Sequence, residues 1–455
     1  MSELTLNKKN TTKDMIDGSP LKCILNFAIP MFFGMLFQQL YSMVDAAIVG
    51  RFLGTEQLAG VGATGSLCFL IIGFCNGVCS GFSIPVAQMF GAKKDSELRK
   101  FVANSVWFSI IIGSVATILT VIFCKDMLVL LQTPSDIFDY SYIYIVILFA
   151  GIPTTFLYNL AAGIIRALGD SRSPVIFLAI ASILNIVLDI VFICLCDMDI
   201  EGAAIATVIS QGVSGTLCII YMKKKFEILR ITKDEWKFRP GYGGKLCYIG
   251  IPMGLQYSVT AIGTLVIQSS VNVLGSIAVA GTTAAQKIGG LLSCPIEALS
   301  ATMATYAGQN VGAKRFDRLT KGLVASSLCG FALSAIMFVF VLFFGKPACL
   351  LFLDADKVSA IGYAYQFLFA SAATYALLTL VGTVRFSIQG MGFSAFAIIA
   401  GFLEMVARFI AGLILAPKIG YLAAAIANPL AWIFADAFLI PAFFYCKRRL
   451  KKIYG

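Results

Sequence analysis

The segment QMFGAK at residues 88–93 recurs as QNVGAK at residues 309–314, an offset of 221 positions. Two further pairs match in the same order: FAIPM at 27–31 with IGIPM at 249–253, offset by 222, and AAIAT at 203–207 with AAIAN at 424–428, offset by 221. This spacing indicates that the second half of the chain repeats the first. Repeated halves in an apolar chain are typical of two pseudo-symmetric bundles around a central substrate path, which indicates a transporter.

The composition favours a membrane protein. Of the 455 residues, 59% are hydrophobic and 13% are charged, whereas soluble domains average about 45–50% apolar and about 25% charged residues. The apolar runs are about 20 residues long, enough to cross a hydrocarbon core of roughly 30 Å. They lack the two-residue alternation of barrel strands, so we expect helices. The first 20 residues are polar, without the apolar core of a cleavable signal peptide.

The apolar runs predict an all-α integral membrane fold of twelve transmembrane helices in two pseudo-symmetric six-helix lobes. The predicted spans lie near 22–49, 58–85, 101–122, 137–158, 174–195, 202–222, 246–275, 282–307, 320–345, 359–382, 394–415 and 421–445. We therefore divide the chain into a cytoplasmic leader (1–21), an N-lobe (22–222), a cytoplasmic linker (223–245), a C-lobe (246–445) and a basic cytoplasmic tail (446–455).

The net charge of +11 is distributed as in a multi-pass protein of the plasma membrane. With a cytoplasmic N-terminus, 28 of the 35 Lys and Arg residues fall in inward segments and five in outward ones, while Lys287 and Arg408 lie within spans. This asymmetry follows the positive-inside rule and predicts that both termini are cytoplasmic. The basic charge therefore indicates orientation and contact with anionic lipid rather than a nucleic-acid partner.

The cysteines do not suggest a cofactor. Thirteen are scattered along the chain, there is no histidine, and no CxxC motif occurs. Zinc or haem ligation is therefore not expected, and most of these cysteines are interpreted as small apolar residues. We expect no cofactor other than a coupling ion, H⁺ or Na⁺.

Acidic residues inside the predicted spans are the first candidates for function. A charge in a span costs about 2.5–3.5 kcal/mol on insertion scales, so its presence needs a reason. Five acids qualify: Asp45, Asp189, Glu297, Glu404 and Asp436.

Four polar residues of the N-lobe are predicted to share one depth. At 1.5 Å per residue, Asp45 and Thr207 lie roughly 9 Å, and Asp189 roughly 12 Å, below the outer surface. Asn185 is one turn before Asp189 and projects from the same face. Their oxygens suit a proton or a hard cation such as Na⁺. Alternatively, Asp45 faces water at the span end and Asn185 is a hydrogen-bonding link between helices.

The C-lobe does not repeat this cluster. At an offset of 219, Glu404 stands opposite Asn185 and Arg408 opposite Asp189. Glu404 and Arg408 have the i,i+4 spacing of a structural ion pair, although a substrate or gating role is the alternative. Glu297 and Asp436, nearer the inner half, either bind a cationic substrate or a proton, or pair with Lys287 or extend toward the interface.

Several motifs resemble the multidrug and toxic compound extrusion (MATE) family. They are QLYSMVDAAIVGR (39–51), LNIVLD (184–189), GAAIAT (202–207) and RALGDSRSP (166–174). The resemblance covers nearly all of residues 22–445. It implies cation-coupled efflux of organic, often cationic, compounds through a V-shaped two-lobed cavity, with the coupling site at Asp45, Asn185, Asp189 and Thr207. Some branches carry acids in helices 7 and 10; here helix 7 has Gln256 and Gln268 instead, which argues against a second-lobe cation site.

We therefore expect a monomeric antiporter, not an enzyme, that exports small amphipathic organic cations in exchange for H⁺ or Na⁺ by alternating access. The intramembrane charges, five acids against Lys287 and Arg408, favour cationic cargo. The alternative transporter is a lipid-linked oligosaccharide flippase of similar architecture, which would need a cationic cavity for its pyrophosphate headgroup. An integral-membrane enzyme would need a nucleophile or metal constellation, and no HExxH motif or histidine is present.

Overall fold

The computed structural model describes residues 14–454, which contain helices and no strands. The helices of the first half are α1 (Pro20–Phe52), α2 (Thr55–Gly91), α3 (Asp95–Ile122), α4 (Cys124–Leu130), α5 (Phe138–Ala150), α6 (Ile152–Ala167), α7 (Arg172–Ile190), η1 (Val191–Leu195), α8 (Ile200–Lys225) and η2 (Glu227–Leu229). Those of the second half are α9 (Pro240–Val273), α10 (Ser276–Gly312), α11 (Phe316–Cys349), α12 (Val358–Ala373), α13 (Tyr375–Gly390), α14 (Ser394–Phe409), η3 (Ile410–Leu415), α15 (Ala416–Ile419) and α16 (Tyr421–Tyr454).

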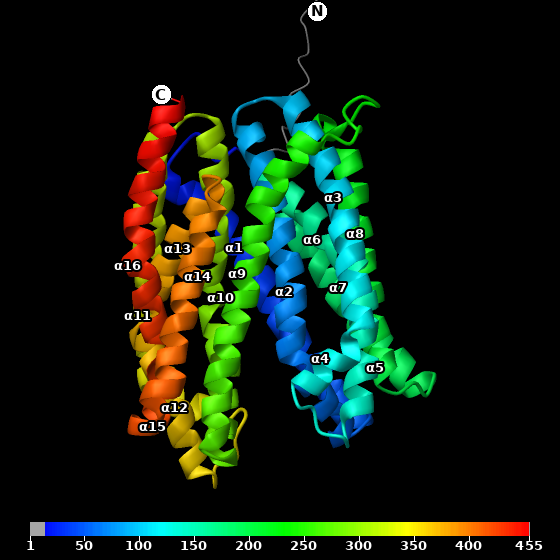
Figure 1. The fold of residues 1–455 in the computed structure, drawn as a ribbon, viewed down its shortest axis with the longest axis vertical. Helices are drawn as coiled ribbons and strands as arrows, with labels where there is room; N and C mark the ends of the chain where they lie inside the picture. Colours follow the sequence, from blue (N-terminus) through cyan, green and yellow to red (C-terminus); the bar gives the residue numbers. More distant parts are fainter. Residues whose placement is uncertain (1–13, 455) are drawn as a thin grey trace, which may run out of the picture.

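The predicted all-α membrane fold is confirmed. Within the described residues, nine helices are long and apolar enough to cross a membrane, and two bent pairs, α5–α6 (47°) and α12–α13 (53°), qualify as one span each. The twelfth membrane-length helix is α10, which has 37 residues, includes Lys287 and Glu297 and is not among the nine. Both ends of the described chain lie at the same end of the molecule (Figure 1), which we call the inner end.

The pseudo-symmetry extends to the irregularities of the helices. The bent pair α5–α6 of the first half corresponds to α12–α13 of the second. Likewise, α7 ends in the π-helical turn η1, which begins at Val191, and α14 ends in η3, which begins at Ile410, 219 positions later. Because π-helical turns are rare, their recurrence at this offset indicates equivalent helices.

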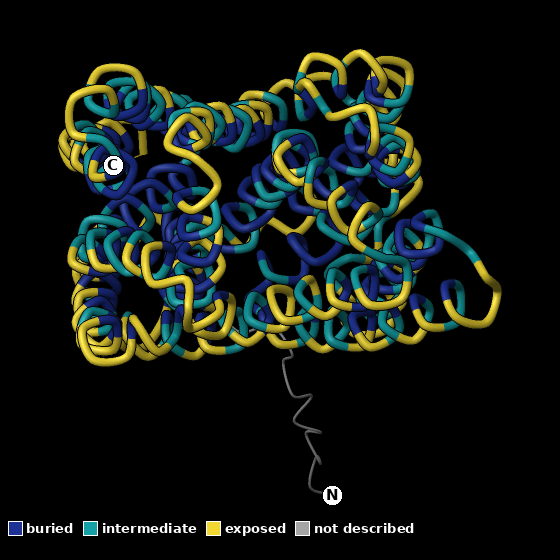
Figure 2. Tube along the Cα trace, turned by 90° about the horizontal axis from the view of Figure 1, so that it is seen from below, coloured by how far each residue is buried: buried dark blue, intermediate teal, exposed yellow. Residues whose placement is uncertain are grey.

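Each half has its own apolar core. One large buried cluster is formed by residues between Leu67 and Leu246, and the other by residues between Ala284 and Leu450. In the end-on view, buried segments lie toward the interior and exposed segments around the rim (Figure 2). The exposed residues include large apolar side chains such as Ile183, Leu328 and Phe343, each more than 60% exposed. Such apolar exposure suits a lipid environment.

The two halves are held together at the inner end by the repeated segments. A Cβ atom on Gly91 would lie 2.0 Å from the backbone oxygen of Gln309, and one on Gly312 would lie 1.8 Å from that of Gln88. Only glycine permits so close an approach of two backbones. The repeat found in the sequence therefore marks the place where α2 and α10 meet.

Two reciprocal hydrogen bonds accompany this contact. The Gln88 amide nitrogen donates to the Gly390 carbonyl oxygen at 3.0 Å, and the Gln309 amide nitrogen donates to the Ala167 carbonyl oxygen at 2.9 Å. Each glutamine thus reaches the end of the bent helix pair in the opposite half. We call Gln88, Gln309 and these two acceptors the inner latch. Farther out, α2 and α9 remain joined by the Ser258 hydroxyl, which donates to the Leu70 carbonyl oxygen at 3.2 Å.

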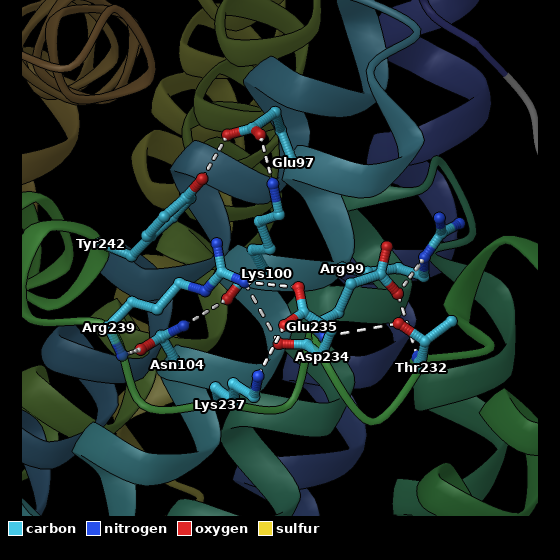
Figure 3. Close-up of polar contacts among 10 residues, drawn as sticks. All are labelled: Glu97, Arg99, Lys100, Asn104, Thr232, Asp234, Glu235, Lys237, Arg239 and Tyr242. Carbon is cyan, nitrogen blue, oxygen red and sulfur yellow. Dashed lines mark hydrogen bonds and ion pairs between the residues drawn. The ribbon is translucent and has the colours of Figure 1, made fainter.

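The predicted linker and tail are more helical than expected. Helix α8 continues to Lys225 and α9 starts at Pro240, because proline is well suited to the first turn of a helix. Only 226–239 is largely irregular, and it folds back on α3 (Figure 3): Arg99 pairs with Glu235 at 2.8 Å, and Asn104 accepts the Arg239 backbone N–H at 2.7 Å. Helix α16 runs to Tyr454, so the basic tail continues its last span.

The leader is described from residue 14 onward. The Met15 backbone N–H donates to the Gln309 side-chain oxygen at 2.8 Å, and the Met15 carbonyl oxygen accepts from Asn310 at 3.2 Å. The described end of the leader is therefore docked beside the inner latch, whereas the rest of it, 1–13, lies outside the described residues.

Candidate substrate cavity and ion site

A cavity of about 600 Å³ lies between the two halves. Its wall is formed by α1, α2, α6, α7 and α8 of the first half and by α9, α10, α13, α14 and α16 of the second. Ligand cavities for drug-sized molecules span about 300–1,000 Å³. The size and the contribution of both halves fit a central substrate path.

The structure brings together the four residues predicted for ion coupling. Asp45 on α1 is 8% exposed and Asp189 on α7 is fully buried, and the two carboxyl groups lie close enough to interact electrostatically. One turn before Asp189, the Asn185 amide nitrogen lies 3.4 Å from the Thr207 hydroxyl on α8. We call these four residues the carboxyl pocket.

The carboxyl pocket has unused hydrogen-bonding capacity. Among the described residues, no donor reaches either oxygen of Asp189, Oδ1 of Asp45 or Oδ1 of Asn185. Two ionised carboxylates in contact would repel each other in a buried site, so this arrangement requires a proton on one of them or a cation between them. The chemistry of the pocket therefore fits H⁺ or a hard cation such as Na⁺.

The carboxyl pocket adjoins the cavity. Asn185 and Thr207 line the cavity wall, whereas Asp45 and Asp189 lie behind them. Two tyrosines near the carboxyl groups, Tyr41 and Tyr144, were not identified from the sequence. Tyr41 precedes Asp45 by one helical turn, and this spacing alone predicts that the two side chains share one face of α1. Tyr144 comes from α5, and no sequence pattern links it to the site.

In the second half, an acid is held between two arginines. Glu404 contacts Arg408 at 3.4 Å, the predicted i,i+4 contact, and it also accepts a hydrogen bond from Arg385 on α13. The prediction had placed Arg385 in an inward loop. Instead it lies within α13 and is 7% exposed. We call Arg385, Glu404 and Arg408 the arginine cluster.

The remaining candidates differ in their surroundings. Asp436 is 5% exposed, its two oxygens have no hydrogen-bond partner among the described residues, and it lies within electrostatic range of Arg385. The proposed partner Lys287 is instead exposed on α10. Glu297 faces the cavity and accepts a hydrogen bond from the Ser293 hydroxyl at 2.6 Å.

The two glutamines of helix 7 are also separated. Gln256 lines the cavity and accepts a hydrogen bond from Gln389 at 2.6 Å. Gln268 lies farther out on α9, donates to Asn272 at 2.9 Å and is not part of the wall. Only Gln256 is therefore placed to meet a substrate.

The charges of the cavity wall differ from those expected. Arg166 on α6, which was assigned to an inward segment, also lines the cavity. The wall therefore contains three arginines, Arg166, Arg385 and Arg408, and two acids, Glu297 and Glu404. The count of five acids against two cations, used to favour cationic cargo, does not describe this wall. The reason is that Arg166 on α6 and Arg385 on α13, which were both expected outside the spans, line the space between the halves.

Comparisons with known proteins agree with the architecture. The family model described as MatE matches residues 30–191 and 252–416. The probable multidrug resistance protein YoeA of Bacillus subtilis (strain 168) is 27% identical over 344 residues, 74% of each chain. The FAD transporter of Shewanella oneidensis is 25% identical over 345 residues, covering 74% of this chain and 75% of its own. A crystal structure of MATE in complex with MaL6 superposes with a TM-score of 0.87 at 23% identity, covering 96% of this chain and 98% of that one.

The matched segments fall one in each half of the molecule, and together they contain three of the four residues of the carboxyl pocket. The resemblance seen in the sequence motifs is thereby confirmed. The chain belongs to the MatE family, the multidrug and toxic compound extrusion transporters.

Proposed function

We propose that this protein is a secondary active antiporter that exports amphipathic organic compounds bearing a cationic group in exchange for H⁺ or Na⁺. The observation that carries the proposal is the proximity of the buried carboxyl groups of Asp45 and Asp189 beside the cavity, with oxygens that no donor in the described chain satisfies. As expected from the charge distribution, we place the protein in the plasma membrane with both termini in the cytoplasm. One chain encloses the whole path, which supports a monomer.

The inner latch supports a transport cycle in which the observed conformation of the two halves is closed to the cytoplasm. An external ion would then reach the carboxyl pocket through Asn185 and Thr207, the two members on the cavity wall. Helix α1, which carries Asp45, packs against α7 of its own half and α10 of the other. Neutralising Asp45 or Asp189 would therefore alter a helix that contacts both halves, and it would favour release of cargo and rocking of the halves.

The driving forces limit the stoichiometry. A charge crossing 100 mV yields roughly 2.3 kcal/mol, and one pH unit yields roughly 1.4 kcal/mol. Exchange of one H⁺ for one monovalent cation moves no net charge. Export of such cargo then depends on the pH gradient or on a second coupling ion, and a gradient of one unit sustains at most about a tenfold cargo gradient.

The test is dye efflux from proteoliposomes under an imposed pH gradient and, separately, under an imposed Na⁺ gradient. We expect one gradient to drive efflux in the wild type and to identify the coupling ion. Asp189→Asn should insert normally but allow only passive equilibration, and Asp356→Asn, at an exposed loop acid, is the matched control. Wild-type efflux by Asp189→Asn would refute the site assignment.

The lipid-linked oligosaccharide flippase is not proposed as a second function. A cationic cavity would favour a flippase, and three arginines do line the wall. However, two of them, Arg385 and Arg408, are neutralised in part by Glu404. The chain's membership of the MatE family favours the antiporter.

A further inference from the structure

The described end of the leader, residues 14–19, lies in a site on α10 of the second half. The Met15 backbone N–H donates to the Gln309 side-chain oxygen at 2.8 Å, and the Met15 carbonyl oxygen accepts from the Asn310 amide nitrogen at 3.2 Å. All three residues are buried. The leader is therefore bound through its backbone rather than resting on the surface.

Arg318 on α11 completes this site. Its guanidinium donates to the carbonyl oxygens of Met15 at 3.3 Å and Gly18 at 2.9 Å, and also to the Asn310 side-chain oxygen at 3.0 Å. Arg318 is buried, and a buried charge is costly unless it is hydrogen-bonded or paired. Two of the acceptors of Arg318 belong to the leader, so the second half is stabilised when the leader is in place.

Apolar packing extends the site toward α1. Met15 forms one buried cluster with Ile24 and Phe27 of α1 and with Met303 and Tyr306 of α10. The outer part of α1 instead packs in a cluster of the first half, with residues of α5 and α8. Because α1 is joined to both halves, the bonds between the leader and the second half tie the two halves together at the inner end.

The site is continuous with the inner latch. Gln309 accepts from Met15 through its side-chain oxygen, and it donates through its amide nitrogen to the Ala167 carbonyl oxygen of the first half at 2.9 Å. One buried side chain thus links the leader, α10 and the end of α6. Separation of α6 from α10 would therefore disturb the side chain to which the leader is bound.

We propose that residues 14–19 act as a strap that holds the inner end closed, and that the strap leaves its site on α10 and α11 when the halves part there. The proposal rests on one element of the proposed function, the rocking of the two halves, and it requires no particular cargo or coupling ion. Gly18 shapes the strap. Its φ of +77° is a left-handed value that favours glycine, and no atom lies within 4 Å of the place where a Cβ atom would be.

Two variants loosen the strap by different means. Arg318→Gln removes the donor to two leader carbonyl oxygens, whereas Gly18→Ala leaves every side chain of the site in place and strains only the bound backbone. Gly420→Ala is the matched control. Gly420 also has a positive φ, +60°, and no atom within 4 Å of its Cβ position, but it precedes α16 at the outer end (Figure 1).

Opening is measured on the detergent-solubilised full chain. Electron-resonance distances are recorded between genetically encoded spin labels at Arg172 and Arg448, which are exposed near the inner ends of α7 and α16. We expect the ratio of open to closed inner ends to rise roughly 10- to 100-fold in Arg318→Gln and roughly 5- to 30-fold in Gly18→Ala. The control should not change it. Hydrogen–deuterium exchange of 14–19 should accelerate in the same two variants.

Faster exchange of 14–19 with unchanged distances would show that the leader binds here without holding the inner end closed. Longer distances without faster exchange would show that opening does not require release of the leader. Either result, or no change in both variants, overturns the proposal. Ion-driven efflux by the wild type with unchanged distances in the variants would refute the strap alone. Longer distances in a chain without ion-driven efflux would refute antiport alone.

Discussion

Equivalent positions of the two halves carry opposite chemistry. Counted back from the π-helical turns that begin at Val191 and Ile410, Asp189 corresponds to Arg408, and Asn185 corresponds to Glu404. In the first half, the acid lies close to another acid and keeps oxygens that have no hydrogen-bond partner among the described residues. In the second half, the acid is held between two arginines. The comparison shows that a duplicated backbone can bring two acids together in one copy and hold an acid between two arginines in the other.

The arginines also differ in how far they lie from the inner ends of their helices. Arg385 lies five residues before the end of α13, whereas Arg166 lies one residue before the end of α6. Arg385 is thus about one turn deeper in its helix, at 3.6 residues per turn, where it reaches Glu404. Arg166 remains near the inner end of α6. The position on α7 that corresponds to Glu404 is occupied by the neutral Asn185.

The largest expected effect is on stability in the second half. Glu404→Gln leaves Arg385 and Arg408 buried, at 7% and 6% exposure, without their acid. Breaking a buried ion pair from one side lowers the free energy of unfolding by about 3–5 kcal/mol. Asp189→Asn is the matched variant and should lower it little or not at all, because it removes a charge that no donor satisfies. Denaturation in detergent measures the free energy of unfolding of both variants. Equal losses in the two variants would contradict the contrast between the halves.

Removing either glutamine of the inner latch should weaken closure in the same direction, in contrast to the acids. Gln88→Ala and Gln309→Ala each remove one hydrogen bond between halves, and we expect each to weaken inner closure by about 1–3 kcal/mol. The effect of Gln309→Ala should be the larger, because this side chain also accepts the Met15 backbone N–H. Electron-resonance distances between genetically encoded spin labels at Asp95 and Asp317 report the closure. Unchanged distances in the double variant would show that the latch does not hold the inner end.

The smallest effect concerns the linker, which has no counterpart in the other half. Arg99 lowers the pKa of Glu235 to about 2. The pair therefore stabilises the folded linker above the ordinary glutamate pKa of about 4.3, and this stability is lost as the pH falls from there toward 2. Because the pair lies near water, we expect about 1 kcal/mol.

Hydrogen–deuterium exchange of 226–239 tests this contribution. The wild-type linker should exchange faster as the pH falls from 5 to 2, beyond the intrinsic dependence of the amide groups. In Glu235→Gln the exchange should already be fast at pH 5 and should show no such additional change. An additional change that persists in the variant would mean that another group is responsible.

The sequence by itself determined the duplication and the membrane fold. Hydropathy, helical rise and repeat spacing are properties of single segments, so they can be read along the chain. Only the tertiary structure decided which side chains meet: that Arg166 faces the cavity, that Arg385 rather than Lys287 lies near Asp436, and that Gln268 does not reach the wall. These relations depend on the rotation of each helix about its axis and on its neighbours in the bundle, and neither is a property of one segment.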